Sequence, residues 1–317
     1  MGDIQYLACG NIMSDSIKDK DGNRSEWNMG GPAFYALSGM RIWTKDCKLV
    51  CRAGADYKDS YGKWMDSNGV SRESVIEDME HCTRLTLSYM PNGSYGVEPV
   101  DREHLGYLKT HSEDIDKACE GHDIKGMYMA HNLDKVIWDR IADVKKKHGF
   151  KIMWEIEYGW NFDEYGDDRG VLLDRVRYIL PLVDAWSINS NEASDLFEIP
   201  KMDDDAIIKE LQKLPTDFTF YRVGERGSFA VTKDNAWFVP ALKLKDEEAD
   251  PTGCGNSSTG AAAYALFSGN NPAMVACMAN VASGYNALQR GPYMLYTGEV
   301  MQRAKEFANE LYVKQGF

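Results

Sequence analysis

The chain contains Asp250-Pro251-Thr252-Gly253-Cys254-Gly255-Asn256, followed directly by Ser257-Ser258-Thr259-Gly260-Ala261-Ala262-Ala263-Tyr264-Ala265-Leu266-Phe267. The alanine-rich second part predicts a helix, and two glycines and a threonine precede it. The first peptide N–H groups of a helix have no internal acceptors, and the helix dipole adds partial positive charge there. Because glycines let a ligand come close to the backbone, Gly253, Cys254 and Gly255 are predicted to form an anion hole suited to a phosphate group.

Around this stretch, short apolar runs alternate with helical patterns, which indicates an α/β fold with a mostly parallel central sheet and helices on both faces. Buried strands are predicted at 4–9, 48–53, 126–130, 152–156 and 185–189, and two more strands at 218–223 and 228–232. A helix is predicted over 32–43, with Pro32 in its first turn.

One region breaks the alternation. The residues on either side of Pro91-Asn92-Gly93 predict a hairpin over 83–97. A small β lid is therefore expected at about 80–110, joined by residues near 12–30, on a single domain that covers 1–317.

The composition excludes several classes of protein. The 317 residues are 44% apolar and 27% charged, as in a globular protein, and the net charge of −13 disfavours nucleic acid or an anionic membrane as a partner. No run of 18 apolar residues predicts a membrane helix, and no signal peptide is visible at the N-terminus. The seven cysteines include no Cys-x-x-Cys motif, and no histidine spacing suits a metal; we expect reduced, mostly buried thiols in a cytoplasmic protein.

A series of short motifs occurs in a characteristic order. With the stretch at 250–256, the order makes the chain resemble the PfkB (ribokinase-like) family of carbohydrate and nucleoside kinases from about residue 4 to 292. The earlier motifs are Gly10-Asn11-Ile12-Met13-Ser14-Asp15, Gly30-Gly31-Pro32, Gly54-Ala55-Asp56 with Gly62, Asn189-Ser190-Asn191-Glu192 and Gly224-Glu225-Arg226-Gly227. The resemblance implies a ribokinase-like fold, ATP and Mg²⁺ as cofactors, and phosphorylation of a hydroxyl on a small sugar, polyol or nucleoside. It also implies a possible homodimer that pairs through the lids.

The resemblance places the substrate near the first two motifs. Asp15 occupies the position that binds substrate hydroxyls, and a carboxylate can accept hydrogen bonds from two neighbouring hydroxyls at once. The alternative is an aspartate that caps a turn. Gly30 and Gly31 are expected to let the backbone approach the substrate, or to form a plain glycine turn.

The resemblance assigns the next motifs to the nucleotide. Glu192 is expected to organise Mg²⁺, usually through water, which suits an ion that keeps several of its waters. Nucleotide-binding positions are Asn189, Gly224, Gly227 and Asn286. A helix N-cap at Asn189 or Ser190, with Glu192 in the first turn, is an alternative that is compatible with the same role. Arg226 is either a phosphate contact or a solvated turn residue.

Asn256 is the one departure in the last motif, because the family has its catalytic base, an aspartate, at this position. An amide cannot accept the hydroxyl proton, and a positioned base contributes about 10²- to 10⁴-fold to the rate. Three accounts stay open: a kinase that is slow or uses another carboxylate such as Asp15, a protein that binds sugar or nucleotide without turnover, and a substitution peculiar to this chain.

Overall fold

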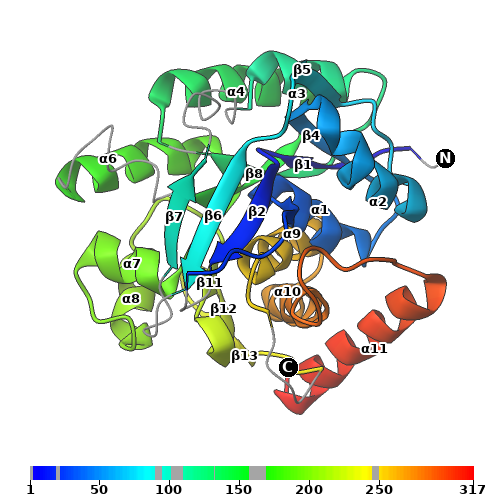
Figure 1. Ribbon diagram of the computed structural model, residues 1–317. Coiled ribbons are helices and arrows are strands. Elements are labelled where there is room, and N and C mark those ends of the chain that lie inside the picture. Colours follow the sequence, from blue (N-terminus) through cyan, green and yellow to red (C-terminus); the bar gives the residue numbers. More distant parts are fainter. Residues whose placement is uncertain are drawn as a thin grey trace.

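The computed structural model describes residues 3–18, 22–89, 95–100, 110–131, 133–156, 169–244 and 250–317. Its centre is a nine-stranded sheet with the order β13-β12-β11-β10-β9-β8-β1-β4-β5 (Figure 1). The strands of this sheet are β1 (Tyr6–Cys9), β4 (Cys47–Gly54), β5 (Val75–Met79), β8 (Gly126–His131), β9 (Lys151–Ile156), β10 (Ala185–Asn189), β11 (Thr219–Arg222), β12 (Gly227–Val231) and β13 (Ala236–Pro240).

The pairing of these strands is parallel from β5 through to β11, and only β12 and β13 at one edge run antiparallel. Strands that are covered on both faces are buried along their whole length and mostly apolar, as β1 and β8 are. The predicted parallel α/β sheet is therefore confirmed. The two strands that the sequence patterns did not predict, β5 and β13, lie at its two edges.

Helices cover both faces of the large sheet, again as predicted, and each face has its own apolar core. One core joins the sheet to α1 (Pro32–Arg41), α2 (Tyr61–Asn68), α9 (Cys254–Phe267), α10 (Pro272–Asn286) and α11 (Gly298–Lys314). The other joins it to α3 (Ser112–Cys119), α4 (Lys135–His148), α6 (Arg169–Ile179), α7 (Ser190–Phe197) and α8 (Asp204–Leu211).

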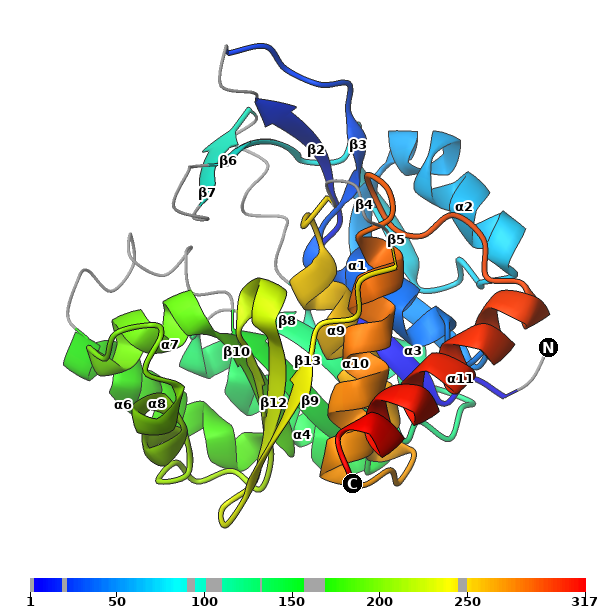
Figure 2. The same ribbon diagram turned by 90° about the horizontal axis from the view of Figure 1, so that it is seen from below.

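A second, four-stranded sheet stands apart from this body, with the order β3-β2-β6-β7. It consists of β2 (Met13–Lys18), β3 (Asn28–Gly30), β6 (Arg84–Tyr89) and β7 (Tyr95–Pro99). Within it β2 and β6 run parallel, while the other two pairs are antiparallel. These strands lie in the two ranges expected for a lid, and Figure 2 shows the sheet beyond one end of the body, on the side where α9 begins. The turn predicted at 91–93 lies outside the described residues.

Two further features of the described chain bear on its class. No helix in the described part is both long and apolar enough to cross a membrane. All seven cysteines are free thiols, and Cys254 is the only one of them that is not fully buried.

Candidate functional site

The first turn of α9 carries the predicted anion hole. Gly253 is the N-cap, with φ of 76°, and Cys254, Gly255 and Asn256 are the first three helical residues. The N–H of Cys254 donates to the carbonyl of Pro251 at 3.1 Å. Among the described residues, the N–H groups of Gly255 and Asn256 have no acceptor. The donors available to an anion are therefore those of Gly255 and Asn256, at the positive end of the helix dipole.

Neither glycine of this turn has room for a side chain, because another residue packs directly against each of them. A Cβ on Gly253 would lie 2.2 Å from the ring of Tyr35, and a Cβ on Gly255 would lie 2.1 Å from an Nη of Arg222. Gly255 thus allows a guanidinium group to rest on the first turn of α9. The sequence alone did not identify this neighbour.

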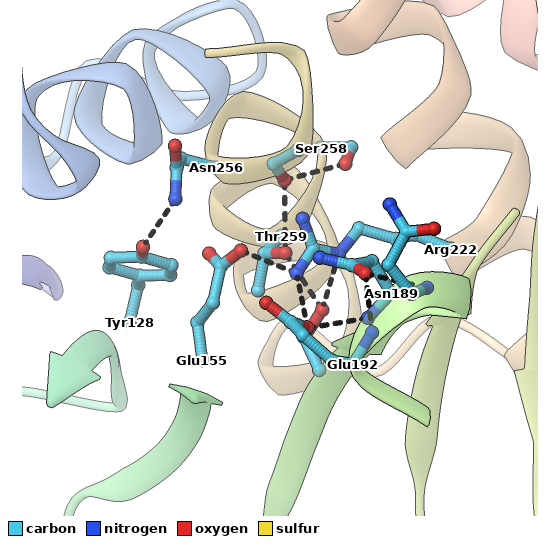
Figure 3. Close-up of polar contacts among 11 residues, drawn as sticks. Tyr128, Glu155, Asn189, Glu192, Arg222, Asn256, Ser258 and Thr259 are labelled. Carbon is cyan, nitrogen blue, oxygen red and sulfur yellow. Dashed lines mark hydrogen bonds and ion pairs between the residues drawn. The ribbon is translucent and has the colours of Figure 1, made fainter. Parts of the chain in front are cut away.

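Asn256 points toward Tyr128, a fully buried residue of β8 (Figure 3). Its Nδ2 donates to the Tyr128 hydroxyl at 3.3 Å, which leaves the amide oxygen of Asn256 available as an acceptor. The structure therefore places an oriented amide at the third helical residue of α9.

Arg222, at the end of β11, belongs to a cluster of charges beside this turn (Figure 3). Its Nη2 lies 2.6 Å from Glu155 Oε1 on β9 and 3.9 Å from Glu192 Oε2 on α7. Its Nε donates to Ser187 Oγ at 3.0 Å, and Ser187 in turn contacts Thr259 of α9 at 2.9 Å. Three neighbouring strands and α9 therefore converge on one guanidinium group.

The carboxylates of this cluster are short of partners. Glu155 is 4% exposed, and its Oε2 has no hydrogen-bond partner among the described residues. Burial raises the pKa of Glu192 to about 7, against the opposing effect of Arg222. Buried carboxylates that carry one cation between them suit the addition of a further positive charge. Within the described residues no three His, Cys, Asp or Glu side chains form a metal cluster, so a cation here would keep most of its waters, as Mg²⁺ does.

Asn189 and Glu192 form a complete capping box at the start of α7. Asn189 Oδ1 accepts from the N–H groups of Asn191 and Glu192 at 2.9 and 3.0 Å, and Glu192 Oε2 accepts from the Asn189 N–H at 2.8 Å. The capping alternative is thus confirmed. Glu192 Oε1 stays available, so the predicted role beside the nucleotide is compatible with the cap.

Asp15 lies in the middle of β2 in the small sheet, paired with Asn28. Its Oδ2 would be 1.8 Å from a Cβ on Gly30, so Gly30 makes room for this carboxylate, while the positive φ of Gly31 sets the turn into α1. Burial raises the pKa of Asp15 to about 8, although the backbone N–H of Gly31 lowers it. Asp15 Oδ1 has no partner among the described residues.

One pocket joins the small sheet to the loop that leads into α9. Its lining includes Asp15, Asn28, Tyr35, Asp250, Thr252 and Arg290. Arg290 lies 3.7 Å from Asp250, which places an ion pair at the rim. Asp15 and two residues of the stretch at 250–256, Asp250 and Thr252, are far apart in the sequence and line this one pocket.

The other residues that were predicted to bind nucleotide, Asn286, Gly224 and Gly227, have structural roles in the backbone around the site. Asn286 is buried and donates to the Thr252 carbonyl at 2.8 Å, which ties α10 to the loop before α9. Gly224 and Gly227 have positive φ, and a Cβ on Gly227 would meet the Val239 carbonyl at 2.1 Å. Arg226 is not a solvated turn residue, because it forms an ion pair with Asp204 in the first turn of α8.

Three residues of the site were missed by the sequence patterns: Tyr128, Glu155 and Arg222. A signal was present for two of them. Glu155 and Arg222 are single charges inside otherwise apolar strand runs, and a charge in a buried strand needs a partner. Their mutual contact exists because β9, β10 and β11 are neighbours in the sheet, and no local sequence pattern predicts that strand order.

Comparisons with known proteins bear on the family and the fold. Residues 22–295 match the pfkB family of carbohydrate kinases. No curated protein matches the chain. Among solved structures, the adenosine kinase from Sinorhizobium meliloti is 18% identical with a TM-score of 0.72, covering 96% of this chain and 99% of its own.

Two more solved structures share the fold. A nucleoside kinase from Burkholderia thailandensis, in complex with inosine, is 18% identical with a TM-score of 0.68, covering 95% of this chain and 96% of its own. The ribokinase of Arabidopsis thaliana, with ribose and ATP, is 16% identical with a TM-score of 0.72, covering 97% and 99%. At such identities the likeness concerns the fold, and it confirms the ribokinase-like architecture. The family match extends over most of the sequence, and the chain therefore belongs to the pfkB family of carbohydrate kinases.

Proposed function

We propose that the protein transfers a phosphoryl group from ATP to a hydroxyl of a small sugar, polyol or nucleoside. The observation that carries the proposal is the pocket shared by Asp15 and the loop before α9. It brings Asp15, whose Oδ1 has no partner among the described residues, together with Asp250 and Thr252, which lie just before the first turn of α9. Hydroxyl recognition and anion binding are thereby adjacent, which is what transfer to an alcohol requires.

At the acceptor end of the cleft, the hydroxyls of the acceptor would be bound by hydrogen bonds. The pKa of Asp15 is about 8, so at neutral pH the carboxyl is largely protonated and both donates and accepts. A polyhydroxylated acceptor offers matching groups of both kinds. Asn28, on the partner strand, lines the same pocket and adds an amide.

At the phosphate end of the cleft, the phosphate would be bound by positive charge and N–H donors. The N–H groups of Gly255 and Asn256 and the α9 dipole would hold the transferred group, with Arg222 resting on the same turn. The amide oxygen of Asn256 would orient the acceptor hydroxyl without removing its proton. We therefore expect phosphoryl transfer at this site to be slower, by about 10²-fold or more, than with a carboxylate at the position.

The donor set also fits a divalent cation beside the phosphates. Glu155 Oε2 is buried with no hydrogen-bond partner in the described part of the chain, and Glu192 shares Arg222 with it and caps α7. These two residues would hold Mg²⁺, which, when bound, supplies positive charge to the phosphate oxygens.

A second function is favoured by one observation, the amide at position 256 with its nitrogen engaged by Tyr128. A protein that keeps both ends of the cleft and lacks a base would bind nucleotide and sugar as a sensor. This alternative shares every residue of the site and differs only in turnover.

The test is ADP release from MgATP with a panel of sugars, polyols and nucleosides, run alongside thermal shift with the same ligands. The proposal expects at least one acceptor to stimulate ADP release and to raise the melting temperature. Thermal shifts by both ligand types with no ADP release would select the binding function. If ATP produces neither a shift nor turnover, the anion site at Gly255 and Asn256 is refuted.

A further inference from the structure

Among the described residues, the cluster around Arg222 has one cation for two carboxyl groups, of which Glu155 is buried and Glu192 is half-buried. Nη2 of Arg222 contacts Glu155 at 2.6 Å and lies 3.9 Å from Glu192. The Arg222 and Glu155 side chains are 12% and 5% exposed, so water contributes little to their neutralisation. Within the described residues Arg222 serves both carboxyl groups, and Glu155 Oε2 is left without a hydrogen-bond partner, so the site has oxygen atoms to offer a further cation.

The same guanidinium group touches the anion site. An Nη of Arg222 lies where a Cβ of residue 255 would be, on the turn that carries the two free N–H groups. A phosphate bound by those N–H groups would therefore come within reach of Arg222 without a change in the backbone. Guanidinium groups bind phosphate with two parallel N–H donors.

The stem of Arg222 is fixed while its end has two possible partners. Nε is held by Ser187 Oγ at 3.0 Å, and Ser187 is itself held by Thr259 on α9. A rotation of the side chain that gives up the contacts with Ser187 and the carboxylates would bring the planar guanidinium group to the phosphates. The site is thus arranged so that Arg222 can exchange its carboxylate partners for phosphate oxygens.

We propose that Arg222 is the resident counter-cation of the nucleotide site, which neutralises Glu155 and Glu192 when no nucleotide is bound. When a nucleotide enters, Arg222 turns to the phosphate oxygens and frees the two carboxylates for the divalent cation that accompanies them. Without nucleotide the resident guanidinium opposes binding of the free cation, so cation and nucleotide bind cooperatively. This inference rests on the proposed function, because it assumes that nucleotide phosphates enter at α9.

The test measures binding alone and needs no acceptor. Titration calorimetry on the full chain would use three ligands: Mg²⁺, the non-hydrolysable ATP analogue AMPPNP without metal, and AMPPNP with Mg²⁺. In Arg222→Met, which keeps the length and removes the charge, we expect Mg²⁺ alone to bind about tenfold more tightly. Metal-free AMPPNP should bind about tenfold more weakly, so the two affinities move in opposite directions.

A matched control and a second variant keep the test decisive. Arg226→Met removes the neighbouring arginine of the same loop, which is paired with Asp204, and should change neither affinity. Glu155→Gln is nearly isosteric; it should weaken binding of Mg²⁺ alone and leave metal-free AMPPNP as tight or tighter. Circular dichroism identifies any variant that does not fold, and if Arg222→Met is one, Glu155→Gln decides.

The outcomes separate this inference from the proposed function. If the wild type binds AMPPNP but Arg222→Met binds Mg²⁺ no more tightly, the exchange is refuted and Arg222 is a structural ion pair. If the wild type binds AMPPNP neither with nor without Mg²⁺, the exchange and the proposed function fail together. Opposite shifts in Arg222→Met, absent in Arg226→Met, support the exchange.

Discussion

The buried carboxyl group of Asp15 and the half-buried carboxyl group of Glu192, which we propose to serve the acceptor and the phosphates, differ in what surrounds them. Asp15 lies in the small sheet with a backbone N–H as its recorded partner, and its pKa is raised to about 8. Glu192 lies on the large sheet beside Arg222, and its pKa is raised less, to about 7. The difference indicates that the Asp15 end suits neutral hydroxyls, while the Glu192 end suits phosphate and a cation.

The largest effect is expected on nucleotide affinity, from a substitution in the first turn of α9. In Gly255→Ala the new methyl group would collide with Arg222 and cover the free N–H groups, so we expect nucleotide affinity to fall about 100-fold or more. Calorimetry with AMPPNP and Mg²⁺ measures the loss. Gly298→Ala is the matched control, because Gly298 also opens a helix and has open space around it. Equal affinity in Gly255→Ala and wild type would contradict the position of the anion site.

The corresponding change at the acceptor end is Asp15→Ala. It removes the hydrogen bonds of the carboxyl group, so kcat/KM for the best acceptor should fall about 10- to 100-fold while the affinity for nucleotide stays the same. Steady-state kinetics and calorimetry together measure the two effects. A parallel loss of nucleotide affinity would show that the two ends are not separate.

The raised pKa of Asp15 also predicts a pH dependence of stability. Between pH about 4 and 8 the folded protein holds a proton on Asp15 that the unfolded chain has released. The free energy of unfolding should therefore fall by about 1.4 kcal/mol per pH unit as the pH rises through this window. Glu192 adds to the fall below pH 7. Urea denaturation at several pH values checks this, and Asp15→Asn should flatten the curve; an unchanged slope in that variant would assign the dependence to other groups.

The smallest effect on kcat is expected from a substitution of Tyr128, which orients Asn256 through one long hydrogen bond. Tyr128→Phe keeps the ring in the core and removes the hydroxyl, so kcat should fall less than about tenfold with KM unchanged. A change in KM alone would mean that Tyr128 shapes the acceptor pocket.

Much of the fold was predictable from the sequence because local signals coincide there with the final structure. Pro32 after two glycines and Gly253 before an alanine-rich run mark the starts of α1 and α9. Edge strand β5 was missed because it is mostly exposed or half-buried and lacks an apolar run. Asp15 was expected after a strand, yet it lies within β2, whose polar sequence hides its pattern.

The site was predictable only where one motif supplies a whole feature. The stretch at 250–256 contains its own glycines, N-cap and helix, so the anion site could be proposed without the fold. The contacts of Arg222 with Glu155 and with Gly255 join residues about 67 and 33 positions apart, and they exist only because β9, β10 and β11 lie in order beside α9.

The most direct test of the account is the rate of ADP formation by wild type and Asn256→Asp, with MgATP and the acceptor found in the panel. Asparagine and aspartate are nearly isosteric, and the new carboxylate would stand in the first turn of α9, where the dipole keeps it ionised. If the site already positions both substrates and lacks only a base, kcat should rise about 10²-fold with little change in KM. A kcat that does not rise, in a variant that still binds both ligands, would contradict the claim that a missing base limits this site.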